Sequence, residues 1–147
     1  MATIRESKVW ARLNNYLKLH KPGKYWIFQR IETGSTVRGF PDVVFLEGGC
    51  AIFLELKEVK GNQIQLSWEQ VNMLTFLANC GFRVWVVAHK IFPTHEAYYL
   101  GHGRYAEDIK ENGIKSQYVH EFDILDKLSL YEMFVVMGIL NPIQLEE

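Results

Sequence analysis

Residues 39–57, GFPDVVFLEGGCAIFLELK, contain two apolar runs on either side of Gly48-Gly49. Two adjacent glycines suit a two-residue hairpin turn, because such a turn needs positive φ angles at both central positions. β-Branched and aromatic residues are frequent in both runs, which is typical of strands. The stretch therefore predicts a hairpin with strands over 43–46 and 51–56.

This hairpin carries charged residues that its apolar pattern does not explain. A turn at the two glycines pairs Glu47 with Cys50, and counting outward along both strands pairs Asp42 with Glu55. Directly opposed residues have Cβ atoms about 4.5–5.5 Å apart. Lys57 lies two residues beyond Glu55, so its side chain points to the same face of the sheet.

Two carboxylates at this separation repel each other by about 3 kcal/mol if the effective dielectric constant is about 20. A divalent cation bound by both carboxylates would offset this repulsion. Mg²⁺ typically binds one or two carboxylates together with waters and phosphate oxygens. The alternative is structural: Asp42 caps the loop after Pro41, and Glu55 pairs with Lys57 at a sheet edge.

An amphipathic helix is predicted over residues 3–20, with Leu13 and Leu17 on its buried side. Glu6 lies on the same side of this helix, so its carboxylate is a candidate further metal ligand. Alternatively, Glu6 completes a capping box with Thr3.

A second helix is predicted to begin at Ser67 and to end at Gly81. Gln70 either closes a capping box with Ser67 or reaches the hairpin acids from the first helical turn. Residues 25–31 and 82–89 have the composition of strands. The first ninety residues therefore predict the order α–β–β–β–α–β.

The remaining segments predict less regular structure. Residues 57–66 are interpreted as a polar connection, residues 96–100 as a short strand and residues 104–112 as a helix. Residues 128–140 predict a helix whose apolar face either docks on the domain or supplies a dimer interface.

Length and composition indicate a single soluble domain over residues 1–147. No run of about 18 apolar residues predicts a membrane span, and the charged N-terminus does not resemble a secretory signal. Cys50 and Cys80 show no metal-binding spacing, so we expect reduced core cysteines in a cytoplasmic protein.

Positive charge is concentrated in the first part of the chain. The net charge is −1, but residues 1–60 contain 10 Lys and Arg against 6 Asp and Glu, whereas residues 61–147 contain 6 against 11. This asymmetry is compatible with a surface that faces phosphates, and equally with charges spread for solubility. The candidate nucleic-acid contacts are Arg5, Lys8, Arg12, Arg38 and Lys60.

Pro41-Asp42 and Glu55-Leu56-Lys57, in this order of elements, resemble the motif of the PD-(D/E)xK nuclease superfamily. The wider stretch from Gly39 to Ala88 is similar to its VRR-NUC branch. The segment GSTVRGFPD is also similar to the loop of archaeal-type Holliday junction resolvases, in which a serine precedes the acidic motif. The resemblance covers about residues 3–90 and leaves out 91–147.

This resemblance implies a restriction-endonuclease-like α/β fold, with an αβββαβ core and a mixed sheet flanked by helices. The strand and helices predicted after residue 90 add a C-terminal α/β extension. The resemblance also implies roles for single residues. Asp42, Glu55, the Leu56 carbonyl and Glu6 would hold Mg²⁺, for which Mn²⁺ substitutes. Lys57 would position or activate the attacking water, Gln70 matches a helix glutamine, and Ser35 matches the resolvase serine.

The function implied is a metal-dependent DNA endonuclease, structure-selective or nonspecific, in phage or bacterial recombination or repair. Its partner is duplex or branched DNA, without a membrane or a small-molecule cofactor. One alternative is a Holliday junction resolvase acting as a homodimer, since two sites must cut symmetric strands. The other is a nuclease-fold DNA-binding module that has lost catalysis.

Overall fold

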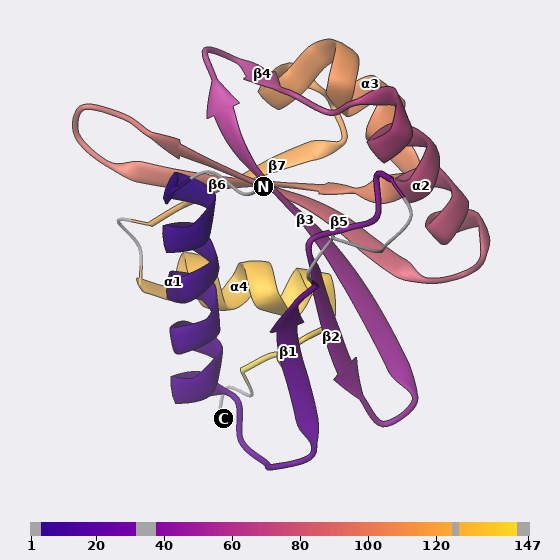
Figure 1. Ribbon diagram of the computed structural model, residues 1–147. Coiled ribbons are helices and arrows are strands. Elements are labelled where there is room, and N and C mark those ends of the chain that lie inside the picture. Colours follow the sequence, from indigo (N-terminus) through magenta and orange to yellow (C-terminus); the bar gives the residue numbers. More distant parts are fainter. Residues whose placement is uncertain (1–3, 32–37, 125–126, 144–147) are drawn as a thin grey trace.

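The computed structural model describes residues 4–31, 38–124 and 127–143 (Figure 1). Its helices, strands and two 3₁₀ turns follow one another in this order: α1 (Ile4–His20), β1 (Trp26–Arg30), β2 (Val43–Glu47), β3 (Cys50–Lys60), β4 (Gln63–Ile64), α2 (Trp68–Asn79), β5 (Arg83–Ile91), β6 (Glu96–His102), η1 (Gly103–Tyr105), α3 (Ala106–Asn112), η2 (Gly113–Lys115), β7 (Val119–Asp123) and α4 (Lys127–Met137).

The strands form one mixed sheet in the order β1-β2-β3-β5-β6-β7, with β4 paired to β3 outside this path. β3 and β5 are parallel, and the other neighbouring pairs are antiparallel. The parallel pair is the one that α2 connects, as a crossover connection requires. The predicted fold class is therefore confirmed: an α–β–β–β–α–β core is followed by an α/β extension.

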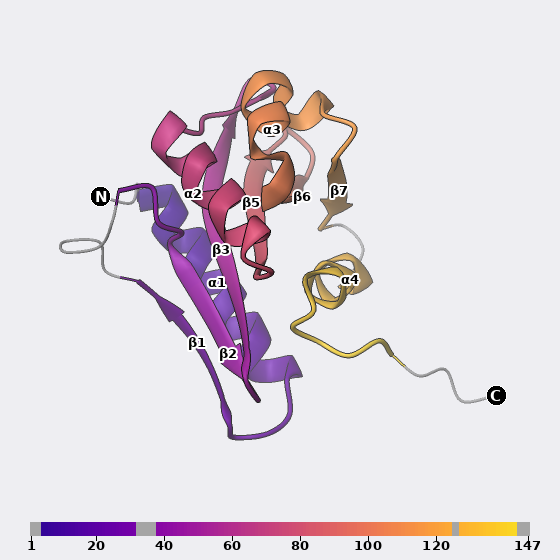
Figure 2. The ribbon, with the colours of Figure 1, turned by 90° about the vertical axis from the view of Figure 1, so that its right-hand side faces the viewer.

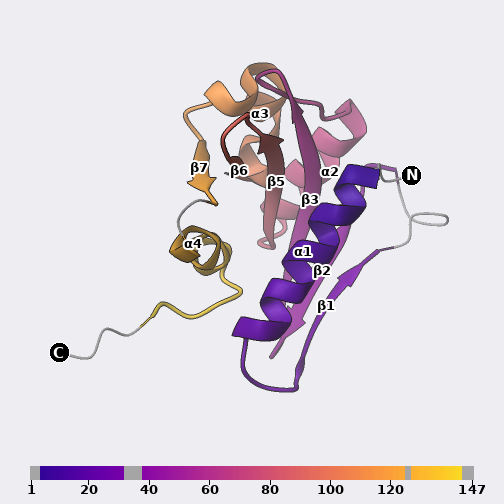
Figure 3. The ribbon, with the colours of Figure 1, turned by 90° about the vertical axis from the view of Figure 1, so that its left-hand side faces the viewer.

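Helices cover both faces of the sheet. One apolar cluster joins α1 and α4 to side chains of β3 such as Leu54 and Leu56. The other joins α2 and α3 to β5 side chains such as Val84 and Val86. Figures 2 and 3 view the molecule from opposite sides, with α2 and α3 nearer the viewer in one and α1 nearer in the other. Each helix of the core thus buries its apolar side on its own face of the sheet.

The hairpin has the predicted register. Gly48 and Gly49 have φ angles of 53° and 81°, and Glu47 pairs with Cys50 and Val43 with Leu54. Both glycines have positive φ, which the short turn requires. The turn therefore sets which side chains of β2 and β3 face each helix layer.

The interpretation of residues 57–66 as a polar connection is wrong. β3 continues to Lys60, and the chain folds back into β4 by pairing Val59 with Ile64. Both of these side chains are buried in the cluster that contains α2 and α3, so the strand extends as far as it has a partner layer. β7 (Val119–Asp123), which the sequence did not predict, closes the far edge of the sheet beside β6.

The apolar tail packs within its own chain. Leu130, Met133, Phe134 and Met137 of α4 are buried in the same cluster as α1. Of the two roles open for this helix, docking on the domain is the one that the structure shows, so its apolar side is not exposed to a partner.

The expectation of core cysteines is wrong. Cys50 is only partly buried, and Cys80 is exposed at the C-cap of α2; both are free thiols.

Within the described ranges, no helix has the combination of length and apolarity that a membrane crossing needs.

Candidate active site

The hairpin register brings Asp42 close to the part of β3 that carries Glu55. Asp42 directly precedes β2, whose first residue, Val43, pairs with Leu54. One carboxylate oxygen of Asp42 accepts a hydrogen bond from the Leu56 backbone N–H, with 3.0 Å between Oδ2 and N. This bond fixes Asp42 against β3 at the residue that follows Glu55.

Glu55 is a buried acid on the α2 side of the sheet. Its neighbours Leu54 and Leu56 face α1, so Glu55 faces the opposite layer. Only 1% of its surface is exposed. Its Oε1 accepts a hydrogen bond of 3.0 Å from Gln70 Nε2 and lies 3.8 Å from Lys57 Nζ. A buried ionised carboxylate needs such partners, because an unpaired charge in a protein interior is strongly destabilising.

Gln70 has both of the roles that its position predicted as alternatives. Its side-chain Oε1 accepts a hydrogen bond of 2.9 Å from the Ser67 N–H, and its backbone N–H donates to Ser67 Oγ at 3.1 Å. This capping box leaves the Nε2 group pointing at Glu55. The bond from Ser67 therefore determines which end of the Gln70 amide reaches the acid, and the predicted helix start is confirmed.

The loop that carries Asp42 is packed directly on the first turn of α2. Gly39 has a φ of 83°, and a Cβ placed on it would lie 2.3 Å from the backbone oxygen of Glu69. Arg38 Nη1 lies 3.9 Å from the Glu69 carboxylate, and the Asp42 carbonyl accepts a hydrogen bond of 2.7 Å from the Ile31 N–H. Only glycine fits at this close approach, so Gly39 couples the position of Asp42 to α2.

The donor groups at this site suit a hard divalent cation. Asp42 and Glu55 can supply carboxylate oxygens, and the backbone between Glu55 and Lys57 can supply the Leu56 carbonyl. Oxygen ligands of this kind bind Mg²⁺ and Mn²⁺. Among the residues whose side chains are described, no group of three or more His, Cys, Asp and Glu gathers around a common point. A cation held here would therefore complete its coordination with water and phosphate oxygens, as Mg²⁺ commonly does.

Three predicted site residues cannot be compared with their predicted roles. Arg5 and Glu6 belong to the first turn of α1, but the structure does not describe their side chains. Ser35 lies outside the described residues. The helix α1 packs on the face of the sheet opposite to the one that Glu55 occupies. The roles predicted for these three residues stay predictions.

The other predicted nucleic-acid contacts lie on different parts of the surface. Lys8 is exposed on α1, Lys60 is exposed at the end of β3, and the Arg38 side chain is 90% exposed beside α2. Of these, Arg38 is in the loop that leads to Asp42, and Lys60 is three residues beyond Lys57.

Arg12 belongs to a polar cluster that the sequence did not predict. Its guanidinium hydrogen-bonds the carboxylate of Glu96, which also lies 3.1 Å from His89 Nε2. The hydrogen bond from Arg12, with smaller contributions from His89, lowers the pKa of Glu96 to about 2, and burial raises the pKa of the nearby Tyr98 to about 12. The partners Arg12 and Glu96 are 84 residues apart, so no local pattern could have revealed them.

The fold is that of the PD-(D/E)xK nuclease superfamily, in which Asp42, Glu55 and Lys57 occupy the positions that the motif predicted. The family described as archaeal Holliday junction resolvase (Hjc) matches residues 12–134, and the chain belongs to this family. Its class is thus that of a nuclease. The family extends through the C-terminal elements that the sequence resemblance had left out.

Among solved structures, the chain is similar to Hjc of Archaeoglobus fulgidus, a Holliday junction resolvase from an archaeal hyperthermophile. The two are 20% identical over 65% of this chain and 72% of that chain, with a TM-score of 0.43. A comparison with curated proteins finds no match.

Proposed function

We propose that this protein is a Holliday junction resolvase: a metal-dependent DNA endonuclease that acts as a homodimer on four-way DNA. The observation that carries the proposal is the family match over residues 12–134, together with the packing of Lys57 and Gln70 around the buried Glu55 beside Asp42. A structure-selective or nonspecific nuclease is the broader form of the same function.

In the proposed reaction, Asp42, Glu55 and the Leu56 carbonyl would hold Mg²⁺ or Mn²⁺. When bound, this cation supplies a Lewis acid that acidifies water and neutralises charge on the phosphate. The Lys57 ammonium orients the attacking water and stabilises the negative charge that develops at the phosphorus. A new P–O bond to the water oxygen forms as one P–O ester bond of the DNA backbone breaks. The attacking water loses a proton to solvent and the departing sugar oxygen takes one up from solvent, so the products are a phosphate monoester and a free hydroxyl.

Gln70 prepares this site without touching the substrate. Its amide holds one oxygen of Glu55 in a fixed position, and Ser67 in turn holds the amide. Catalytic groups that are already in place need no rearrangement during the reaction. Gln70 is therefore a positioning residue in this proposal.

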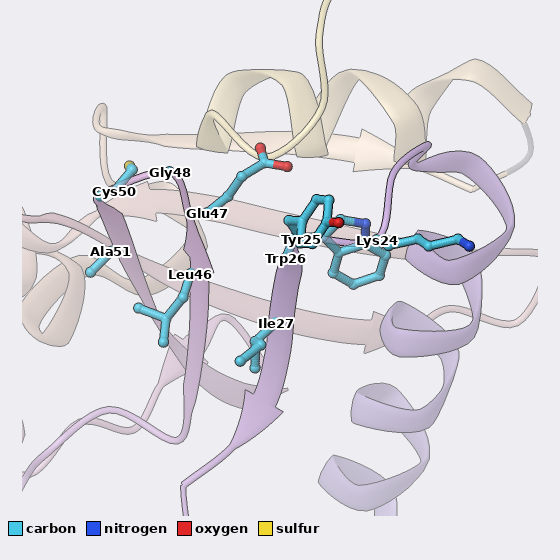
Figure 4. Close-up of a pocket in the computed structure, with 10 residues that line it drawn as sticks. Lys24, Tyr25, Trp26, Ile27, Leu46, Glu47, Gly48, Cys50 and Ala51 are labelled. Carbon is cyan, nitrogen blue, oxygen red and sulfur yellow. The ribbon is translucent and has the colours of Figure 1, made fainter.

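A four-way junction has paired strands that two symmetric active sites can cut, which is the reason for proposing a two-fold dimer. Because the α4 tail is buried in its own chain, another apolar surface must supply the interface. We assign it to the outer part of the β1–β2 sheet face, where Tyr25, Ile27 and Leu46 are 93%, 51% and 41% exposed. They line a shallow hollow of about 600 Å³, and Figure 4 shows Ile27 and Leu46 directed to the same side.

The symmetry of a two-fold interface suits this apolar surface. In a two-fold interface, residue i of one copy meets residue j of the other, and j meets i. The exposed side chains of Tyr25, Ile27 and Leu46 can therefore pack on the same side chains of a second copy. The Glu47 carboxylate at this hollow is paired within its own chain, since its Oε1 lies 3.0 Å from Lys21 Nζ.

The central experiment incubates the protein with four-way, nicked, single-stranded and linear DNA, in Mg²⁺, Mn²⁺ or EDTA. We expect paired, symmetric cuts in four-way DNA that require the metal and disappear in Glu55→Ala and Lys57→Met. Lys18→Met is the matched control, because this lysine is exposed near the end of α1, which packs on the face of the sheet opposite to Glu55. Metal-dependent cutting without paired cuts would leave only the broader nuclease function. Tight binding with no cutting under any metal would show a binding module instead.

The dimer is tested separately by sedimentation. We expect Leu46→Asp to give monomers that still nick DNA but lose paired cutting, whereas Leu19→Asp, at a residue 81% exposed on α1, leaves the dimer intact. A Leu46→Asp protein that remains dimeric would rule out this surface.

For a protein with this activity we propose the cytoplasm of a bacterium or a phage-infected cell, where its DNA substrate is found.

A further inference from the structure

One exposed strip beside the active site contains no acidic residue. The strip runs from Val59 to Trp68, through the end of β3, the turn, β4 and the start of α2, and it includes no Asp or Glu, although the chain has 17. Its exposed residues are Lys60, Gly61, Asn62, Gln63, Gln65, Ser67 and Trp68. A surface of amides, a lysine and an indole, without carboxylates, offers donors and stacking area to a negatively charged partner.

The strip is held rigidly although most of its side chains are exposed. Ile64 and Leu66 anchor it, with exposures of 1% and 2%. Two lysines from other elements donate to its carbonyls: Lys90 Nζ to Gly61, at 2.6 Å, and Lys110 Nζ to Leu66. A polar surface that is fixed before binding loses little conformational entropy on binding.

The C-terminal extension supports the same strip at its turn. The Ile114 N–H donates to the Asn62 carbonyl at 2.9 Å. Gly113, at a φ of 59°, packs so closely that an added Cβ would lie 2.0 Å from that same oxygen. Figure 1 shows β4 and α3 side by side. Together with the Lys110 contact, this packing gives α3 and η2 a function: they hold the strip in place next to the active-site strand.

Trp68 is the residue of the strip with the greatest capacity to bind. It is the first residue of α2, two positions before Gln70, and 58% of its surface is exposed. Lys110 Nζ lies 5.2 Å from the centre of its ring, a cation–π contact that orients the indole. An oriented, exposed indole is a platform on which an unpaired base can stack.

We infer that Trp68 stacks on a base at the branch of the DNA, where continuous stacking of the duplex is broken, while the amides of the strip contact the adjoining strand. This inference rests on the proposed function, because it names the part of the substrate that the same site recognises. Continuous duplex offers no unstacked base, so Trp68 gives preference for branched over linear DNA. Trp68 is thus a specificity-determining residue, and Lys110 is its positioning residue.

The test measures binding in EDTA, where metal-dependent cutting does not occur, with four-way DNA and linear duplex of equal length. We expect Trp68→Ala to weaken binding of four-way DNA by roughly 5- to 150-fold, the range for loss of one base-stacking contact. Binding of linear duplex changes by less than about twofold, because phosphate contacts supply nonspecific affinity. The dependence of binding on salt keeps its slope, since stacking releases no counterions.

Two further variants separate stacking from a general effect of mutation. Trp68→Phe keeps an aromatic face and is expected to retain most of the affinity. We also expect four-way DNA to quench the tryptophan fluorescence of the wild type, and this quenching to be lost in Trp68→Phe. Phe76→Ala removes another aromatic residue of α2, 60% exposed, and is expected to bind like the wild type. Circular dichroism confirms that each variant is folded.

The inference is wrong if folded Trp68→Ala binds four-way DNA as tightly as the wild type, or loses affinity for both DNAs equally. The same result would leave the resolvase proposal standing if the wild type still makes paired cuts. A wild type that binds no DNA of any form removes the proposed function itself. Trp68→Ala that retains DNA binding but loses association with a protein partner would assign the strip to that partner instead.

Discussion

Substitution of Gly39 by alanine tests whether the contact between the Asp42 loop and α2 controls catalysis. Gly39 has a φ of 83°, and an added Cβ would lie 2.3 Å from the Glu69 oxygen and 2.8 Å from the Gln70 nitrogen. Both neighbours are backbone atoms of the first turn of α2, so neither can rotate away. The loop that leads to Asp42 must therefore move.

The size of the effect follows from two separate terms. The left-handed conformation costs a residue with a Cβ about 1–2 kcal/mol. The contact must also open from 2.3 Å to an ordinary van der Waals distance, which displaces the loop by about 1 Å. Misplacement of catalytic groups by about 1 Å lowers rates by about 100-fold. We expect Gly39→Ala to cut DNA about 100-fold more slowly than the wild type.

Gly23→Ala is the matched control, because Gly23 also has a left-handed φ, of 96°, but has no atom within 4 Å of an added Cβ. Gly23→Ala has only the cost of the left-handed conformation and no steric clash. Its melting temperature should therefore fall by about 2–8 °C, while its rate of cutting stays unchanged. The assay combines thermal unfolding with the initial rate of cleavage of four-way DNA in Mg²⁺. Wild-type cutting by Gly39→Ala, with a melting temperature no lower than that of Gly23→Ala, would refute the coupling of this loop to the active site.

Three further outcomes can be checked with the same protein. Gln70→Leu removes the donor to the buried Glu55, so urea unfolding should show a loss of about 1–3 kcal/mol and cutting should slow; unchanged values of both would contradict the positioning role. Because the pKa of Glu96 falls from 4.5 to about 2, the stability from its pair with Arg12 is present above about pH 4.5 and is lost as the pH falls toward 2. The full pKa shift corresponds to about 3 kcal/mol, but we expect the pair to contribute about 1–2 kcal/mol because the Arg12 side chain is 46% exposed and screened by solvent. Glu96→Gln should remove this part of the pH dependence of stability in urea titrations. An unchanged pH profile would show that the Arg12–Glu96 pair does not contribute it. Phe134→Ala in α4 should cost about 3–5 kcal/mol, and a loss below about 1 kcal/mol would show that the tail does not belong to the core.

The parts of the fold that the sequence predicted are those in which local chemistry decides the structure. The two glycines at 48–49 require a short hairpin turn, and a turn of known length sets the register of both strands. The capping box of Ser67 and Gln70 marks a helix start through residues three apart. These signals need no knowledge of the rest of the chain, and both are confirmed by the structure.

The parts that the sequence did not predict depend on partners far along the chain. Residues 57–66 have the polar composition of a loop, but Ile64 is buried by elements from the C-terminal extension, including Ile109 of α3. In the same way, Arg12 looks like a free surface cation until Glu96 is brought beside it. Tertiary packing overrides local propensity at such positions.

The candidate site shows the same division. Glu55 and Lys57 share a face because side chains alternate along a strand, and this period can be read from the sequence. The depth at which Glu55 is buried, and the choice of Gln70 as its hydrogen-bond donor, depend on α2 crossing over the strand. Gly39 belongs to the site for a reason that only the structure reveals, since its backbone touches the helix that carries Gln70.

The C-terminal extension makes the core of this nuclease stiffer where the substrate is expected. Without α3 and η2, the turn between β3 and β4 would lose the Ile114 bond to its Asn62 carbonyl, and the segment after β4 would lose the Lys110 bond to the Leu66 carbonyl. A two-residue strand such as β4 has little stability of its own. Lys57, the proposed catalytic lysine, lies on the same strand, three residues before this strand ends at Lys60. We therefore expect support of the turn by the extension to limit the motion of β3 at Lys57. In that way the elements beyond the α–β–β–β–α–β core would contribute to the precision of the proposed active site as well as to the surface that carries Trp68.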